Sequence, residues 1–124
     1  MSKPIKITAG QMTFKAELND SPTAKAIAQA LPINAVASRW GGEIYFSIPV
    51  RVGLEKDARE VVQAGELGYW PTGNAFCIFF GPTPVSDGDE ICAASAVNII
   101  GKVAGSLVQL WNVQDGAPIT IEAD

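Results

Sequence analysis

Apolar and polar residues alternate along several short runs of the chain, which is the pattern of strands with one buried face. Ile5 and Ile7 alternate with lysines, and residues 12–18 alternate again after a turn, so the sequence predicts an N-terminal hairpin. The spacing then changes to the helical period. Ser21 is placed to cap the first free amides of a helix over residues 22–31, and a proline follows the last of these residues.

The period of two returns in the middle of the chain. Residues 35–40 and 43–50 predict two strands joined by a tight turn at a pair of glycines. In a regular strand, Glu43 and Tyr45 face the side opposite to the apolar positions. The charged stretch that follows predicts a solvated connection, with a short helical turn or strand near residues 58–63.

Residues 66–84 form the most aromatic part of the sequence. Within it, residues 75–80 are an unbroken apolar run, which predicts a central strand buried on both faces. Trp70 stands before a proline that favours an extended conformation. The remaining chain predicts a long strand, a short helix and a final strand, at residues 93–103, 106–113 and 119–121.

The composition indicates one globular domain over residues 1–124. Hydrophobic residues make up 48% and charged residues 18% of the chain, which excludes a disordered protein. The net charge of −4, with no basic patch, argues against nucleic acid and anionic membranes as partners. No run is long enough to span a bilayer, and the N-terminus lacks the apolar core of a signal peptide, so we expect a cytoplasmic protein.

The chain contains no histidine, and this excludes several kinds of chemistry. A Ser-His-Asp triad and a Cys-His dyad both need imidazole. Cys77 and Cys92 are isolated and form no zinc motif; in a cytosolic protein we expect both to be free thiols, Cys77 as a core residue. The acidic residues at 87, 89 and 90 lack the spacing of a calcium loop and predict a solvated turn. We therefore expect no metal and no cofactor.

Both ends of the chain resemble cyclophilins. The residues that carry the resemblance are Phe14, Glu17, Leu18, Pro22, Thr23 and Ala24 near the start, and Ile100-Gly101-Lys102-Val103, Gly105, Leu107-Val108 and Ile119-Thr120-Ile121 near the end. The middle resembles a family of small, uncharacterised prokaryotic cyclophilin-like proteins, through Trp40-Gly41, Glu43-Ile44-Tyr45-Phe46, Gly68-Tyr69-Trp70-Pro71 and Phe79-Phe80-Gly81-Pro82-Thr83-Pro84. The resemblance spans nearly the whole chain. It implies a mainly β fold, a closed eight-stranded antiparallel barrel with two helices.

Cyclophilins are peptidyl-prolyl isomerases, but the resemblance is weakest where that activity lies. Their Phe-His-Arg motif is represented only by Ala37-Ser38-Arg39, and their Gln-Gly-Gly-Asp stretch has no counterpart. If the protein were an isomerase, Arg39 would be its catalytic residue. The sequence offers no polar neighbours that would hold this guanidinium, so we expect little or no isomerase activity.

Three functions stay open at this point. The first is binding of a small molecule or peptide in an aromatic and polar cleft. The second is prolyl isomerisation, and the third is a structural role in which exposed aromatics meet a second copy of the chain. For the first, we expect these cleft residues: Arg39, Trp40, Glu43, Tyr45, Tyr69, Trp70, Phe80 and Pro82. The alternatives are that the tryptophans only fill the end of a barrel and that Arg39 and Glu43 form a weak surface ion pair.

Overall fold

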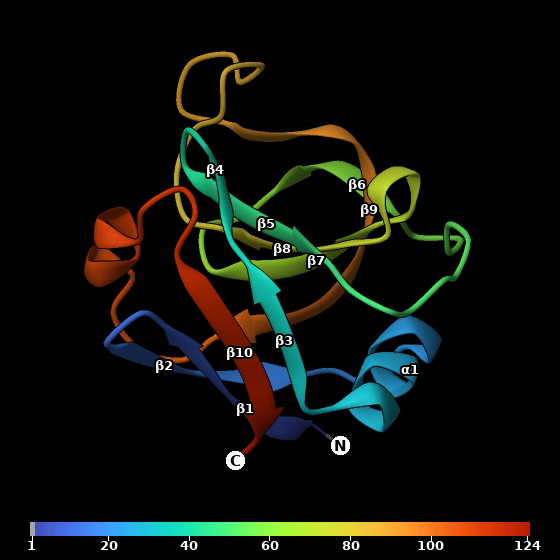
Figure 1. Cartoon of the computed structure of the whole chain (residues 1–124). Coiled ribbons are helices and arrows are strands. Elements are labelled where there is room, and N and C mark those ends of the chain that lie inside the picture. Colours follow the sequence, from blue (N-terminus) through green and yellow to red (C-terminus); the bar gives the residue numbers. More distant parts are fainter. Residues whose placement is uncertain (1) are drawn as a thin grey trace.

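The computed structural model describes residues 2–124, which form an antiparallel, mainly β structure with one α-helix (Figure 1). The strands are β1 Lys3–Ala9, β2 Met12–Leu18, β3 Ile33–Val36, β4 Ser38–Trp40, β5 Glu43–Ser47, β6 Arg59–Val62, β7 Glu66–Trp70, β8 Ala75–Phe79, β9 Ile91–Val103 and β10 Pro118–Ala123. The helix is α1 Pro22–Ala30, and two short 3₁₀ helices are η1 Pro71–Gly73 and η2 Val108–Asn112.

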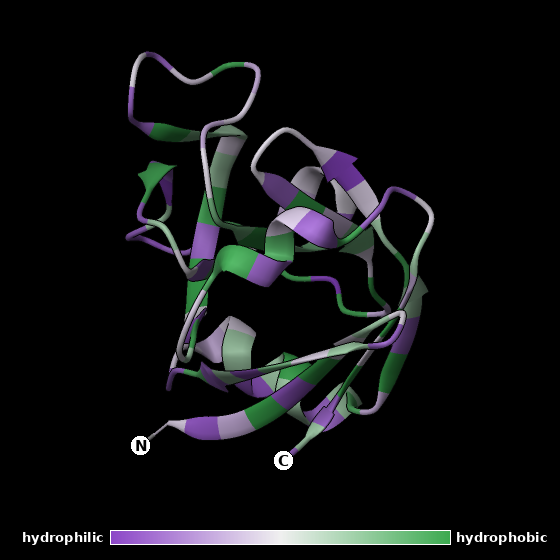
Figure 2. Ribbon diagram, turned by 90° about the vertical axis from the view of Figure 1, so that its left-hand side faces the viewer, coloured by the Kyte–Doolittle hydropathy of each residue, from purple (hydrophilic) through white to green (hydrophobic). Residues whose placement is uncertain are grey.

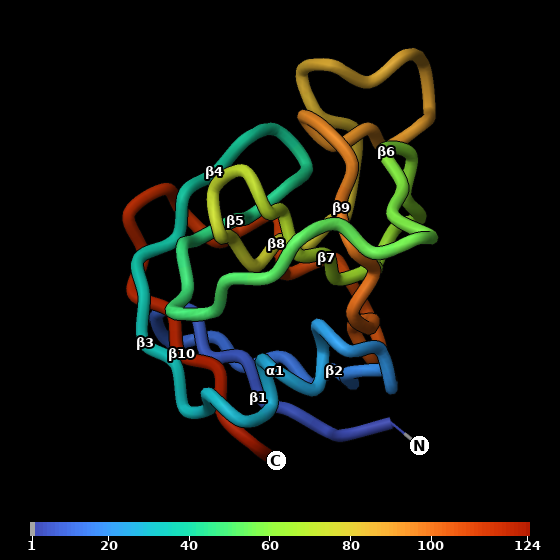
Figure 3. The backbone as a smooth tube through the Cα atoms, turned by 90° about the vertical axis from the view of Figure 1, so that its right-hand side faces the viewer, coloured from blue at the N-terminus to red at the C-terminus, as the bar shows by residue number. Residues whose placement is uncertain are grey.

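The strands form two layers joined by the long strand β9. Within the described residues their hydrogen-bonded order is β3-β10-β1-β2-β9-β7-β8-β5-β4, and β6 pairs with β9 beside this path. Figures 1 and 3 show β1, β2 and β10 in the lower layer and β4, β5, β7 and β8 in the upper layer. Both chain ends lie beside the lower layer, and the loop between β8 and β9 lies at the opposite end of the molecule.

The closed eight-stranded barrel that we expected is not present. Ten strands are described in residues 2–124, and their path begins at β3 and ends at β4 without a ladder between these two. The two end strands are consecutive in the chain and are separated only by Ala37. The amide of Ala37 donates to Ala117 and its carbonyl accepts from Gly116, so this residue anchors the corner where the chain leaves the lower layer. The two ends of the strand path, β3 and β4, are thus joined through the chain at Ala37 and not by a ladder of hydrogen bonds.

The alternation in the sequence explains how the strands pack. In β1 the residues Ile5, Ile7 and Ala9 are buried while the two residues between them are partly exposed. Figure 2 shows the same alternation of apolar and polar positions along the strands. All five residues of β8 are buried, which confirms the prediction of a central strand covered on both faces. The core therefore has two parts, one on each side of the upper layer.

The helix predicted at 22–31 is confirmed over Pro22–Ala30. The side chain of Ser21 accepts a hydrogen bond from the amide of Ala24, as expected for an N-cap. Ala24 and Ile27 bury the apolar face against the main core. The second predicted helix, at 106–113, was wrong in type and length: only the short 3₁₀ helix η2 forms there, with Leu110 buried.

Candidate functional site

The hairpin of β4 and β5 presents different residues on its two faces. Trp40 pairs with Glu43 and Arg39 pairs with Ile44, so these two pairs point to opposite sides of the sheet. Tyr45 lies two residues after Glu43 and shares its face. Ile44 belongs to the main core between the layers. The face of Trp40, Glu43 and Tyr45 is therefore the outer face of the upper layer.

A pocket of about 120 Å³ lies on this outer face. Its lining comes from β4, β5, β7 and β9: Trp40, Glu43, Tyr45, Trp70, Ala93, Ala94 and Val97. Three of these residues are aromatic, and Glu43 is the charged residue among them. The pocket thus combines aromatic walls with a single carboxyl group.

Glu43 is buried, although it is a charged residue at a tight turn. The residue is only 6% exposed. Among residues 2–124, its Oε1 is the buried side-chain oxygen or nitrogen that has no hydrogen-bond partner. A buried polar group without a partner is unusual and costs stability. The alternative of a surface ion pair between Glu43 and Arg39 is wrong, because the two side chains lie on opposite faces of the sheet.

The thiol of Cys77 lies beside this carboxyl group. Tyr45 pairs with Cys77 across β5 and β8, which places Cys77 diagonally next to Glu43 on the same face. Burial raises the pKa of Glu43 from 4.5 to about 7, and the neighbouring thiol of Cys77 opposes this rise. Burial and the nearby carboxyl raise the pKa of Cys77 well above its usual value. The thiol therefore stays protonated and Glu43 is the group that titrates near neutral pH.

A hydrogen bond holds one aromatic wall in place. The indole Nε1 of Trp70 donates to the hydroxyl oxygen of Ser95 over 2.6 Å. Gly73 lies directly against the same ring, since a β-carbon at this glycine would be 2.8 Å from the indole. Trp70 is thus fixed from β9 and from the turn that follows it.

The structure places Arg39 away from the pocket. Its Nε donates to the carbonyl of Gly41, and its Nη1 donates to the carbonyls of Trp111 and Val113 over 3.1 and 2.9 Å. Its guanidinium also stacks over the rings of Phe80 and Trp111. The expectation that nothing holds this guanidinium was therefore wrong. Arg39 ties the β4–β5 hairpin to η2 and the segment after it.

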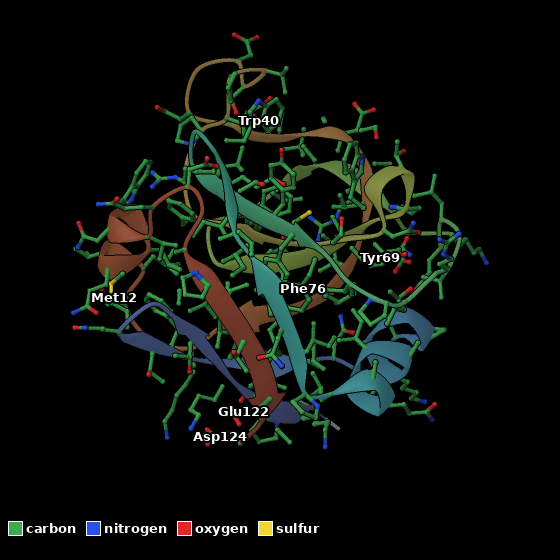
Figure 4. The ribbon with its side chains drawn as sticks, viewed as in Figure 1. Met12, Trp40, Tyr69, Phe76, Glu122 and Asp124 are labelled. Carbon is green, nitrogen blue, oxygen red and sulfur yellow. The ribbon has the colours of Figure 1, made fainter. Side chains whose placement is uncertain are left out.

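The other three residues that we predicted for the cleft also lie elsewhere. Tyr69 is fully buried in the main core and donates its hydroxyl to the carbonyl of Val50. Phe80 is buried and packs edge-on against Trp111. Pro82 is exposed in the loop after β8. Figure 4 shows the separation, with Trp40 at the upper end of the molecule and Tyr69 and Phe76 in its middle.

Three pocket residues, and one residue that supports the pocket, were absent from our prediction. Ala93, Ala94 and Val97 line the pocket from β9, and Ser95 holds Trp70. The sequence carries a signal for them, because a run of small residues from 93 to 96 leaves space above a sheet. Their position beside β5 depends on the return of β9 to the upper layer, which local spacing does not reveal.

The raised pKa of Glu43 predicts a pH dependence of stability. A carboxyl whose pKa is higher in the folded than in the unfolded state destabilises the fold as pH rises between these two values. We expect the free energy of unfolding to fall by about 3 kcal/mol between pH 4.5 and pH 8. Urea denaturation of the wild type and of Glu43→Gln measures this. If the free energy of unfolding fell equally with pH in the wild type and in Glu43→Gln, the prediction would be wrong.

No helix in residues 2–124 is long and apolar enough to cross a membrane. In the same range, no three residues of the types His, Cys, Asp and Glu are grouped so that they could hold a metal ion. The pocket on the outer face contains the carboxyl of Glu43, with the thiol of Cys77 beside it, and three aromatic rings.

Comparison with known proteins agrees with the resemblance seen in the sequence. A hypothetical protein from Archaeoglobus fulgidus, with a structure determined in solution, is 41% identical to this chain. The match covers 99% of this chain and 95% of that protein, with a TM-score of 0.85. No curated protein matches. The family model described as cyclophilin-like matches residues 3–122, and the chain belongs to this cyclophilin-like family.

Proposed function

We propose that this protein is a binding module that takes one end of a small molecule into the outer pocket. The observation that carries the proposal is Glu43, which lines the pocket, is 6% exposed as a residue and has a buried carboxyl oxygen, Oε1, without a hydrogen-bond partner. Buried groups of this kind are stable only if something offsets their cost, and a bound ligand does so.

The size of the pocket limits what enters it. A cavity of about 150 Å³ holds one benzene ring. The pocket of about 120 Å³ therefore takes a group of about five or six non-hydrogen atoms, such as a head group or a short chain. A larger ligand would keep the rest of its atoms outside. The aromatic rings supply contact area, and Glu43 supplies the polar contact that orients the ligand.

Prolyl isomerisation is the weaker candidate. It needs a donor aimed at the amide of the substrate. Arg39 already donates to three backbone carbonyls and stacks on two rings, on the other face of the sheet from the pocket. The geometry of Arg39 fits a structural role in the hairpin. Glu43 cannot replace it as the donor, because a charged carboxylate only accepts hydrogen bonds.

The indole protons of the three tryptophans provide a test by nuclear magnetic resonance. Trp40 and Trp70 line the pocket, whereas Trp111 contacts Phe80 and serves as an internal reference. We expect at least one of n-butylammonium, n-butanol and butyrate to shift the signals of Trp40 and Trp70 in a saturable way, with the Trp111 signal unchanged. Affinities on the order of 1 mM are reasonable for molecules of this size.

Two variants of β9 sharpen this test. Ala94 lines the pocket and is exposed, so Ala94→Leu should fill the space and abolish the shifts without unfolding the protein. Ala96 lies on the same strand but does not line the pocket. Ala96→Leu is therefore the matched control, and the shifts of the indole signals should remain in this variant. Equal shifts at all three indoles, or none with any of the three probes, would contradict the proposal.

A further inference from the structure

The unpaired oxygen of Glu43 defines what a ligand must bring. A carboxylate accepts hydrogen bonds and donates none. Oε1 of Glu43 has no partner, and the nearby thiol of Cys77 is a weak donor. A ligand that carries N–H groups would supply the missing hydrogen bond. A ligand with only methyl groups around its charge would leave Oε1 unpaired and would still exclude water from it.

The charges around the pocket favour a positive group. Its lining contains three aromatic rings and one carboxyl group, and neither lysine nor arginine is among the described lining residues. Aromatic rings attract cations through their negative faces. A buried carboxylate without a counter-charge is costly, and a hydrogen-bonded cation offsets that cost. An anion would meet the same carboxylate with no positive group to balance it.

The loop before β9 adds negative charge close to the pocket. Its first residues pack on the β4–β5 hairpin, where the amide of Gly42 donates to the carbonyl of Pro82. Its last residues lead directly into the part of β9 that lines the pocket. Three exposed carboxylates lie in this loop, at Asp87, Asp89 and Glu90. Figure 1 shows the loop beside the end of β4. The negative electrostatic potential of these carboxylates raises the local concentration of cations.

We propose that the outer pocket selects a primary ammonium or guanidinium group, whose N–H groups donate to Glu43 and whose charge lies among Trp40, Tyr45 and Trp70. This inference rests on the binding function proposed above and assigns its ligand class. The amine of a small metabolite and a basic side chain at the end of a peptide present the same chemistry. The pocket volume admits only the charged end of either.

Four probes of similar size test separately whether the ligand needs a positive charge and whether it needs N–H groups. n-Butylammonium has a charge and N–H groups, tetramethylammonium has a charge without N–H groups, n-butanol is neutral and butyrate is negative. At pH 8 we expect n-butylammonium to bind at least tenfold more tightly than n-butanol and tetramethylammonium, and butyrate not to bind. Glu43→Gln should reduce the affinity for n-butylammonium to that for n-butanol. Glu122→Gln, which changes a carboxylate on β10 in the lower layer, is the matched control and should have less than a threefold effect.

The dependence of binding on pH gives a second readout. Among the elements around the pocket, β5 contributes Glu43 and Tyr45, β8 contributes Cys77, and the lining residues of β4, β7 and β9 contribute no ionisable side chain. The pKa of Glu43 is about 7, and the cation binds its charged form. The affinity for n-butylammonium should therefore fall about tenfold for each pH unit below 7, while that for n-butanol should not change.

The outcomes distinguish the two proposals. Equal affinities for n-butanol and n-butylammonium would overturn the cation inference and leave the binding function in place. Equal affinities for tetramethylammonium and n-butylammonium would overturn the requirement for N–H groups. Binding of butyrate alone would overturn the inference as a whole. Shifts with none of the four probes would overturn both proposals. Because Glu43→Gln removes a buried charge, we expect this variant to fold, and its urea denaturation curve checks that it does.

Discussion

Replacing Gly42 with alanine is expected to lower the free energy of unfolding by about 3 kcal/mol or more. A β-carbon at Gly42 would lie 2.2 Å from the carbonyl carbon of Gly81. This neighbour is backbone, so no rotation of a side chain can relieve the overlap. The carbonyl of Gly42 accepts from the amides of Phe80 and Gly81, and these bonds hold the hairpin against the segment after β8. The added methyl group must break this contact.

The same change should also abolish binding in the outer pocket. Gly42 lies between Trp40 and Glu43, and a displaced hairpin moves both residues. Gly53→Ala is the matched control, because a β-carbon there meets nothing within 4 Å and the residue does not have a positive φ angle. Chemical denaturation and the indole signals measure the two effects. A Gly42→Ala protein as stable as Gly53→Ala would contradict the packing described here.

The sequence predicted which residues share a face of a strand better than it predicted which residues line the pocket. Strict alternation in β5 placed Glu43 and Tyr45 on one face, and the structure confirms that they share it. The same rule separates Arg39 from Trp40, which are neighbours on one strand. Our candidate cleft combined residues of both faces, because residues that are neighbours in a strand point to opposite sides of the sheet.

The alternation of apolar and polar residues could not predict that Glu43 is buried. Alternation shows which face a side chain occupies, but not what covers that face. The cover comes from β7 and β9, which are far from β5 in the sequence. For the same reason, the resemblance at both ends predicted the fold family but not the place where the strand path stays open. That gap depends on Ala37 bonding to residues near 117, about eighty positions away.

Asn98→Ala is the second change with a large expected effect. Asn98 is 1% exposed and its amide connects three separate segments. Its Nδ2 donates to Thr23 Oγ1 over 2.9 Å and to the carbonyl of Gly53 over 3.0 Å. Its Oδ1 accepts from the amide of Glu55 over 2.7 Å. The carboxylate of Glu55 then accepts from the amide and hydroxyl of Thr23, near the start of α1.

Removing the amide would leave several buried groups without partners. Each lost partner of a buried polar group costs about 1–3 kcal/mol. We therefore expect Asn98→Ala to lower the free energy of unfolding by about 3–5 kcal/mol, measured by urea denaturation. Asn34→Ala is the matched control: the Asn34 side chain is exposed and accepts one bond from Thr120, so its loss should cost less than about 1 kcal/mol.

Asn98→Asp tests whether the donor or only the shape of this side chain matters. Aspartate fills the same space, but its second oxygen would face the carbonyl of Gly53 as another acceptor. The hydroxyl of Thr23 already donates to Glu55, so it has no proton left for the new carboxylate. We expect Asn98→Asp to be as destabilising as Asn98→Ala at pH 7. If the aspartate variant kept wild-type stability, the amide of Asn98 would not be what holds α1 and the segment from Gly53 to Glu55 against β9.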